Sequence, residues 1–233
     1  MGHTPVGPGK FAILIQMSSQ PRRATSPVRS GGILANSARR REIVDRAAEL
    51  FEKRGYHNVS VEDIATAVGL RKSSLYHHIE SKDQILALIH HEFMDLVIGR
   101  QEARLAIPMS NSQRLLEVMA DILQLMETHR GHVRVFFEHY RELPESDRRD
   151  VKVERDRYEG MVEQVLRVGI DQGEFRPVDV RLTALAIFGA CNWAYQWYRR
   201  GGPLGTRDIA YIFWDIFSQG LAAESAGSSS RGS

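Results

Sequence analysis

Apolar side chains recur at helical spacing along most of the chain, and the first clear period lies over residues 41–54. Charged residues fill the other positions of this segment, so it predicts an amphipathic helix that ends near Arg54. Gly55 follows in the position of a left-handed C-terminal cap. The periodic apolar residues are Ile43, Val44, Ala47, Leu50 and Phe51.

Two shorter helical patterns come next. Ser60 opens the first of them, with Asp63 three residues later in capping-box spacing. The second covers residues 71–80, where Leu75 and Ile79 form one apolar face. Two short helices joined by a glycine-containing turn match the helix-turn-helix plan.

The outward face of the third pattern is basic and rich in hydroxyl groups, with no acidic residue between Arg71 and His78. A face that only meets solvent would normally mix Glu and Lys, so a small three-helix subdomain with a solvated face is the weaker interpretation. Such donors suit phosphate oxygens and base edges. The side chains left to face outward are Arg71, Lys72, Ser73, Ser74, Tyr76 and His77.

The segment from Ala48 to Leu86 resembles the DNA-binding domain of TetR-family transcriptional regulators. One position departs from the family pattern, because Ile79 stands where Phe is usual, and we expect this side chain to pack inward. The motifs that carry the resemblance are Phe51-x-x-x-Gly55-Tyr56, Ser60-Val61-x-x-Ile64-Ala65, Ala67-Val68-Gly69-Leu70 and Ser74-Leu75-Tyr76-x-His78-Ile79-x-Ser81-Lys82-x-x-Ile85-Leu86.

Double-stranded DNA is therefore the expected partner of this segment. We expect residues 71–74 to reach base edges or adjacent phosphates, and Lys72 to influence sequence preference. The resemblance implies that Tyr76, His77 and Lys82 hold phosphates, so removal of Lys82 should weaken binding to all sequences. The full set of candidate DNA contacts is Arg40, Arg41, Ser60, Arg71, Lys72, Ser73, Ser74, Tyr76, His77 and Lys82.

The predicted fold class is all-α, with a DNA-binding domain over residues 39–86 and a helical bundle over 87–224. Residues 1–38 read as a disordered basic extension or, alternatively, as the product of a misassigned start upstream of Met17. Residues 225–233 read as a disordered tail. The expected later helices are Ser81 to Arg104, Ser112 to Thr128, Gly131 to Arg141, Ser146 to Gln172, Val178 to Arg200 and Thr206 to Ala223.

The last two expected helices are apolar almost all the way round, and such helices must be covered on every side. The rest of the bundle can cover only one side. A second copy of the chain, packing these helices into an intermolecular four-helix bundle, is the simplest cover. The alternative is a deeply buried helix in a monomer. A homodimer also suits a palindromic operator, whose half-sites lie about one helical turn apart.

A regulator also needs a cavity for its effector, and Met and aromatic side chains suit an adaptable apolar pocket. Residues 192–204, preceded by Gly169-Ile170-x-x-Gly173-x-Phe175-Arg176-Pro177, resemble a TetR subgroup that senses acyl-CoA thioesters in fatty-acid and steroid breakdown. Arg199 and Arg200 could bind the CoA phosphates or, alternatively, could be favourable charges at a helix end. The candidate apolar contacts are Leu116, Met119, Leu123, Met126, Phe136, Phe137, Tyr140, Trp193 and Trp197.

Charge and composition sharpen this picture only in places. Residues 1–83 carry a net charge of +5 and residues 84–233 a net charge of −3, so positive charge goes with the expected DNA-binding segment. The nine histidines include the pair His90-His91 and, farther on, His129, His132 and His139. Adjacent histidines point to different faces of a helix and no nearby carboxylate completes an evident ligand set, so no metal is expected. Cys191 is the only cysteine, and we expect a core residue in a cytoplasmic protein.

The expected function is that of a ligand-responsive, DNA-binding repressor. An effector that binds in the bundle would move the helix that begins at Ser81 and so change the spacing of the two DNA-binding domains. The alternative is a dimer that binds DNA as an architectural protein or activator without an effector. No catalytic constellation or cofactor motif is visible, so an enzyme is not expected.

Overall fold

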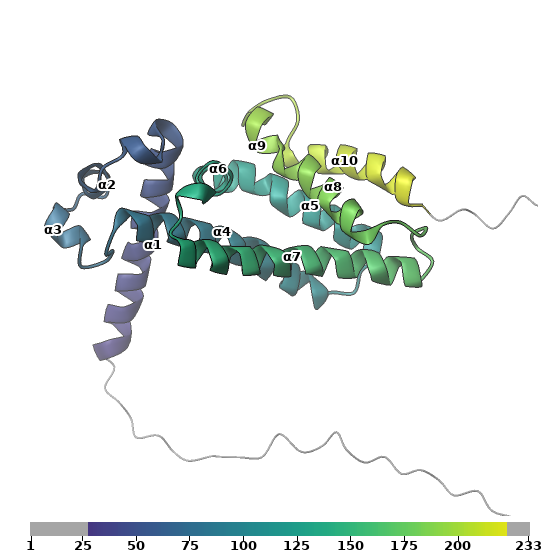
Figure 1. Ribbon diagram of the computed structural model, residues 1–233, viewed down its shortest axis with the longest axis horizontal. Coiled ribbons are helices and arrows are strands. Elements are labelled where there is room, and N and C mark those ends of the chain that lie inside the picture. Colours follow the sequence, from purple (N-terminus) through teal and green to yellow (C-terminus); the bar gives the residue numbers. More distant parts are fainter. Residues whose placement is uncertain (1–27, 223–233) are drawn as a thin grey trace, which may run out of the picture.

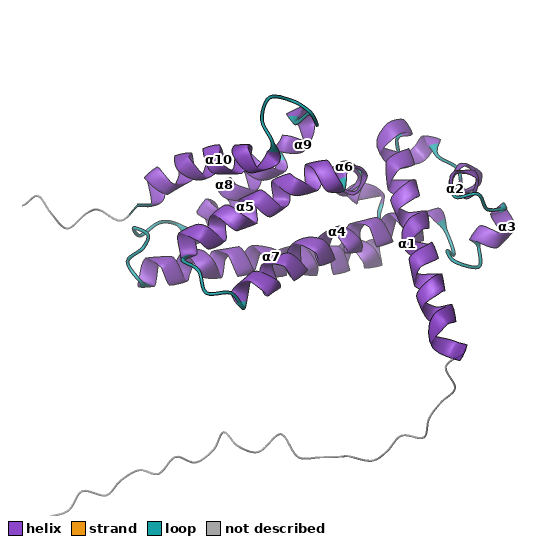
Figure 2. Cartoon of the chain, turned by 180° about the vertical axis from the view of Figure 1, so that it is seen from behind, coloured by secondary structure: helices purple, strands orange, loops and turns teal. Residues whose placement is uncertain are grey.

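The structure, a computed structural model, describes residues 28–222, and the elements of that part are helices and short 3₁₀ turns (Figures 1 and 2). The expected tail over residues 225–233 and most of the expected N-terminal extension lie outside the described residues. The elements are α1 Val28–Arg54, η1 Tyr56–Asn58, α2 Val61–Ala67, α3 Lys72–Leu75, α4 Lys82–Leu105, α5 Asn111–Thr128, α6 Arg130–Glu138, η2 Tyr140–Glu142, α7 Glu145–Asp171, α8 Val180–Asn192, α9 Ala194–Trp197 and α10 Thr206–Leu221.

The first helix begins at Val28, well before the expected start near Arg41. The apolar period that set the expected start is a signature of packing, and a helix can continue beyond the last turn that packs. Ala38, Arg39 and Arg40 favour helix, and adding a residue to an existing helix costs far less than nucleating one. Part of the segment expected to be disordered is therefore helical.

The helix-turn-helix lies at one end of the molecule and the bundle extends away from it (Figure 1). Helix α4 contacts α1 and runs along α7, and α4 and α7 form one layer of the bundle. Helix α5 lies across this layer and contacts α7, α8 and α10. Helix α6 packs on both α1 and α4, and so joins the two parts of the chain.

The helix expected over residues 178–200 is broken. Helix α8 ends at Asn192, α9 covers only Ala194–Trp197, and the chain is extended at Tyr198. Tertiary contacts compete with the continuous helix here: the Tyr195 ring stacks on Phe137 at 5.1 Å between centroids, and the Tyr198 hydroxyl donates to Glu127. These contacts turn the chain back onto α5 and α6.

The corner between α7 and α8 explains the glycine and aromatic residues of its motif. A Cβ on Gly169 would lie 2.2 Å from the Phe175 ring, so only glycine leaves room for that ring. Gly173 has a φ of 72°, a conformation that glycine adopts readily. The Arg176 amide then donates to the Leu221 carbonyl at 2.9 Å. The motif fastens the end of α7 to the end of α10.

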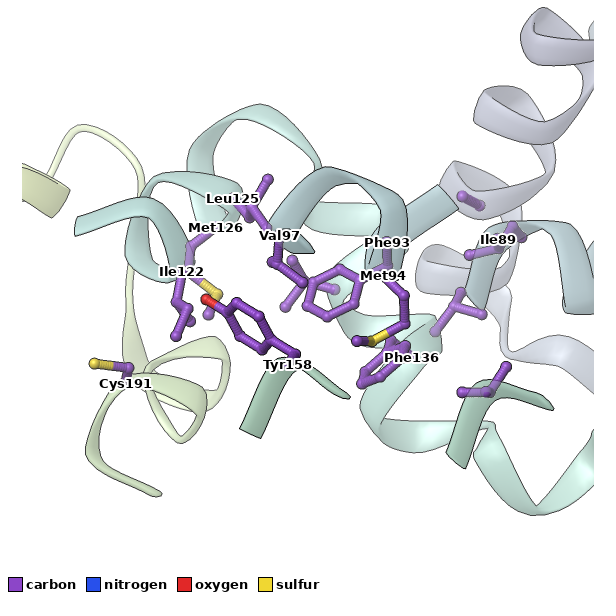
Figure 3. Packing of buried hydrophobic residues seen from close by; sticks show 14 of the residues in the cluster. Ile89, Phe93, Met94, Val97, Ile122, Leu125, Met126, Phe136, Tyr158 and Cys191 are labelled. Atoms are coloured by element: carbon purple, nitrogen blue, oxygen red, sulfur yellow. The ribbon is translucent and has the colours of Figure 1, made fainter. Parts of the chain in front are cut away.

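A single buried cluster runs from α1 through the bundle, and Figure 3 shows its centre, where side chains of α4, α5, α6 and α7 meet. Cys191 is fully buried there, and burial raises its thiol pKa to about 12, as expected of a core cysteine. No helix among the described residues is both long and apolar enough to cross a membrane.

Candidate functional site

The helix-turn-helix is assembled by a capping box and two inward-facing apolar residues. The Ser60 hydroxyl accepts from the Asp63 amide at 3.1 Å, and the Asp63 carboxylate accepts from the Ser60 amide at 2.8 Å, as the spacing predicted. Leu75 and Ile79 are buried, which confirms the inward orientation of Ile79. The opposite side of α3 is therefore turned to solvent.

Most of the predicted DNA contacts are exposed, and Ser74 is half-buried. Within the described residues the positively charged members of this set on α1 and α3 make no ion pair, so their charge is available to a partner. These residues are Arg40, Arg41, Arg71 and Lys72. Neighbouring Arg39 behaves differently, because it donates to the Val68 carbonyl at 2.6 Å and to Glu42 at 2.5 Å. It holds α1 against the end of α2.

Lys82 differs from the rest of the predicted set. Its ammonium donates to the carbonyls of Tyr56 and Val59, both at 3.0 Å, and lies 4.1 Å from the centre of the Tyr56 ring. Two of its three donors are therefore used to fasten the segment between α1 and α2 to the start of α4. The Tyr56 hydroxyl donates to Asp83, and burial together with this bond raises the pKa of Tyr56.

One face of α8 and α10 carries exposed apolar side chains. Leu182 on α8 and Ile216 on α10 are each 64% exposed, and Tyr211 and Ile212 are also exposed. Helix α10 packs inward on α5 and α8. The large apolar residues that the sequence placed on these two helices are thus divided between the core and one uncovered face.

A partly open cavity of about 60 Å³ lies between α4, α5, α6, α7 and α8. Its inner wall is aromatic: the rings of Phe93 and Phe136 lie 4.2 Å apart between centroids, and Phe188 lies beside Tyr158 at 5.4 Å. Figure 3 shows Phe93, Met94, Phe136 and Tyr158 converging on this region. The lining residues are Phe93, Met94, Val97, Ile122, Phe136, Phe137, Arg155, Tyr158, Glu159, Phe188 and Asn192.

Of the predicted ligand contacts, Phe136 and Phe137 line the cavity. Tyr140 lies close by, since the Arg155 guanidinium is 5.6 Å from its ring centre. None of the four predicted ligand contacts on α5 lines the cavity. Leu116 is half-buried, and Met119, Leu123 and Met126 are buried core residues.

The predicted aromatic and basic contacts at the end of α8 do not line the cavity either. Trp193 is 62% exposed and Trp197 is also exposed, and Arg199 and Arg200 lie on the exposed loop after α9. The expectation rested on the subgroup resemblance of residues 192–204, and the sequence also predicted a continuous helix to Arg200. The break after Asn192 turns these side chains to the surface instead.

Sequence reasoning missed the contribution of α7 to the cavity. Arg155, Tyr158 and Glu159 of α7 line the cavity, although none of them was among the predicted ligand contacts. A weak signal was present, because Val151, Tyr158 and Val162 are spaced by seven and four residues and all are buried. This apolar stripe marks the inner face of α7.

His90 is a buried polar residue beside the cavity wall. Its Nδ1 lies 2.9 Å from the Leu86 carbonyl, and its ring centroid lies 5.3 Å from that of Phe136. Burial lowers its pKa to about 4, so the imidazole is neutral at pH 7 and donates from Nδ1. Its Nε2 has no hydrogen-bond partner among the described residues.

Comparisons with known proteins agree with both halves of this arrangement. Residues 43–89 match the family of bacterial regulatory proteins named tetR, and residues 108–221 match the tetracyclin repressor-like C-terminal domain. The HTH-type transcriptional repressor KstR2 of Mycolicibacterium smegmatis is 28% identical over 187 residues, which cover 79% of this chain and 91% of that protein.

Two solved structures are similar throughout. The TetR-family transcriptional regulator PfmR of Thermus thermophilus is 31% identical with a TM-score of 0.72, and the match covers 76% of this chain and 97% of that one. AibR, solved with isovaleryl coenzyme A and operator DNA, is 28% identical with a TM-score of 0.70 over the same shares. The chain therefore belongs to the TetR family and is a ligand-responsive, DNA-binding transcriptional regulator.

Proposed function

We propose that the chain acts as a homodimeric repressor that binds a palindromic operator and is released from it by an acyl-CoA thioester. The observation that carries the proposal is the double role of α4. Phe93, Met94 and Val97 of this helix line the cavity, and its N-cap Ser81 follows directly after the helix-turn-helix. A ligand that displaces α4 therefore moves the DNA-binding surface.

The apolar face of α8 and α10 supports the homodimer. Covering apolar surface stabilises by about 25 cal/mol per Å², so several large exposed side chains on one face favour association. A twofold axis at this face would pair each helix with its copy. Ile216→Glu would place a charge on this apolar face, so the variant should sediment as a monomer in a sedimentation-velocity experiment.

A matched control exists for this experiment. Val153 is 68% exposed and belongs to α7, so it is not part of the apolar face of α8 and α10, and Val153→Glu should leave the dimer intact. A wild-type chain that sediments as a monomer at micromolar concentration would contradict the proposed dimer.

The exposed donors of α3 support major-groove binding. Arg71, Lys72 and Ser73 would reach base edges or neighbouring phosphates, and Tyr76 and His77 would hold the backbone. Two copies related by a twofold axis would contact half-sites about one helical turn apart. A regulator of this kind works in the cytoplasm, and no catalytic step is proposed for it.

An acyl-CoA thioester combines an apolar chain with anionic phosphates, and the cavity lining includes both apolar rings and a cationic side chain. The Phe93, Phe136 and Phe188 rings suit the acyl chain, and the exposed Arg155 guanidinium suits a phosphate. AibR, a relative of similar fold, binds isovaleryl coenzyme A. Arg155 thus takes the role that the sequence suggested for Arg199 and Arg200.

The size of the cavity supports release by the effector. Ligand pockets usually measure about 300–1,000 Å³, whereas this cavity measures about 60 Å³. An acyl group can enter only if the surrounding helices or their side chains separate. The ligand then prefers a conformation different from this one, and it releases the operator if that conformation binds DNA less tightly.

Isothermal calorimetry with acyl-CoA thioesters of increasing chain length, the matching free acids and free CoA would test this proposal. We expect binding of at least one thioester, and weakening of about tenfold or more in Arg155→Gln, since one charge-assisted contact contributes about 1.5–3 kcal/mol. Arg149→Gln, an exposed residue of the same helix, is the control. A panel in which no thioester binds would exclude this effector class.

A further inference from the structure

Three helices bring together a group of metal-ligating side chains outside the cavity and the DNA-binding surface. Asp45 of α1, Glu92 of α4 and His132 of α6 each present one ligand atom, and these atoms lie within 4.8 Å of one another. His132 is buried, Glu92 is half-buried and Asp45 is exposed. The group lies at the joint between the DNA-binding domain and the bundle.

The position of His132 is fixed by its neighbour Gly131. A Cβ on Gly131 would lie 2.9 Å from the carbonyl carbon of Ala48 and 3.0 Å from its oxygen, so glycine lets α6 press directly on α1. Ala48 is one helical turn beyond Asp45. The imidazole is thus held beside a carboxylate from α1 on one side and beside Glu92 of α4 on the other.

Hydrogen bonding alone accounts poorly for this geometry. The Nε2 atom of His132 lies 3.3 Å from Glu92 Oε2 and 3.6 Å from Asp45 Oδ1. Charge-assisted bonds between a nitrogen and a carboxylate measure about 2.7–2.9 Å, and Nε2 carries at most one proton to donate. Two carboxylates therefore compete for one imidazole proton, and neither lies at the usual charge-assisted hydrogen-bond distance from Nε2.

The same spacing suits a shared cation. Donors bound about 2.0–2.2 Å from a tetrahedral zinc ion lie about 3.3–3.6 Å apart, which is close to both distances from His132. Asp45 and Glu92 also interact unfavourably, because their ligand oxygens lie within 4.8 Å of each other and both carboxylates carry negative charge. A divalent cation would neutralise both carboxylates.

We propose that Asp45, Glu92 and His132 bind one divalent transition-metal ion, with Zn²⁺ as the best-matched probe. One imidazole and two carboxylates are ligands that zinc accepts, and three protein ligands leave a fourth position for water. The ion would join α1 to α4 and α6. It would therefore stabilise the joint through which the bundle acts on the DNA-binding domain.

Calorimetric titration of the EDTA-treated full-length chain with ZnCl₂ tests the site. We expect one Zn²⁺ per chain, no comparable binding of Mg²⁺, and a higher Tm with zinc, because a ligand that binds the folded state stabilises it. Asp45→Asn and Glu92→Gln should each weaken zinc binding about tenfold or more, by loss of a charged ligand. Asp95→Asn, an exposed carboxylate of α4, should leave it unchanged.

A second measurement avoids dependence on the variants. In the wild-type chain, ¹⁵N NMR of the histidine rings should show that Zn²⁺ shifts the His132 signals first as the metal is added. Zinc binding of wild-type strength in both Asp45→Asn and Glu92→Gln would overturn the proposal. So would the absence of zinc binding by the wild-type chain, or ring shifts confined to other histidines.

Discussion

The DNA-binding surface and the cavity are built in opposite ways. Arg71, Lys72 and Ser73 of the proposed DNA-binding surface come from consecutive positions, are exposed and contribute nothing to the core. The cavity is lined by residues of five helices, and rings such as Phe93 and Phe136 are part of the core that they line. Binding and stability are therefore separable in the first region and coupled in the second.

This difference determines what each region can change in evolution. A new operator sequence needs only new side chains on an exposed face of α3, at little cost in stability. A new effector needs a different cavity wall, and every such change alters packing around α4. Four substitutions would break or sharpen this contrast.

Phe136→Ala should have the largest effect. Truncating a buried phenylalanine costs about 3–5 kcal/mol, and Phe136 packs on Phe93 and His90. Urea unfolding should show this loss, together with a change in thioester affinity. Unchanged stability would mean that the cavity wall is not part of the core.

His90 should make stability depend on pH. Its pKa is about 4 in the folded state and 6.5 in the unfolded chain, so the unfolded state takes up the proton first as pH falls. The free energy of unfolding should be fully present above pH 6.5 and should fall by about 3 kcal/mol between pH 6.5 and pH 4. Denaturant unfolding across this range measures the loss.

The control is His90→Asn, whose amide can keep the bond to the Leu86 carbonyl but cannot titrate. Its stability should depend less steeply on pH over the same range. If the free energy of unfolding fell equally with pH in the wild-type chain and in His90→Asn, His90 would be excluded as the source of the pH dependence.

Lys82→Met should cost about 1–3 kcal/mol of stability, because it leaves two carbonyls without their donor while keeping the apolar part of the side chain. The substitution should leave the salt dependence of DNA binding unchanged, because the Lys82 ammonium already donates to two carbonyls in the free protein. A shallower slope of affinity against salt would instead support the phosphate contact that the sequence suggested.

Lys72→Ala should have the smallest effect on stability, within about 0.5 kcal/mol, since the side chain is exposed. It should nevertheless weaken operator binding by about 1–3 kcal/mol if it reads a base, and more on the operator than on random DNA. Fluorescence anisotropy with both DNAs measures the difference. Equal losses would assign Lys72 to the phosphate backbone.

The same contrast explains what the sequence could predict. The capping box at Ser60 and the burial of Leu75 and Ile79 follow from patterns within ten residues, and the structure confirms them. The subgroup motif around Gly169 and Phe175 proved to be a packed corner. Its residues were recognised, but their role required the fold.

The misses within the bundle depend on contacts between distant segments. The break after Asn192 follows from packing of Tyr195 and Tyr198 on α5 and α6, which no local period records. Likewise the cluster of Asp45, Glu92 and His132 joins residues separated by 40 positions or more. Periodicity identifies the inner face of a helix but not which inner faces meet.

The central claim is that the cavity and the DNA-binding surface are coupled through α4. The most direct measurement is operator affinity by anisotropy with and without a saturating thioester, paired with thioester affinity with and without operator. We predict that each ligand weakens the other by the same factor, about 5–150-fold, because coupling is reciprocal. Operator affinity that no bound thioester changes would contradict the account.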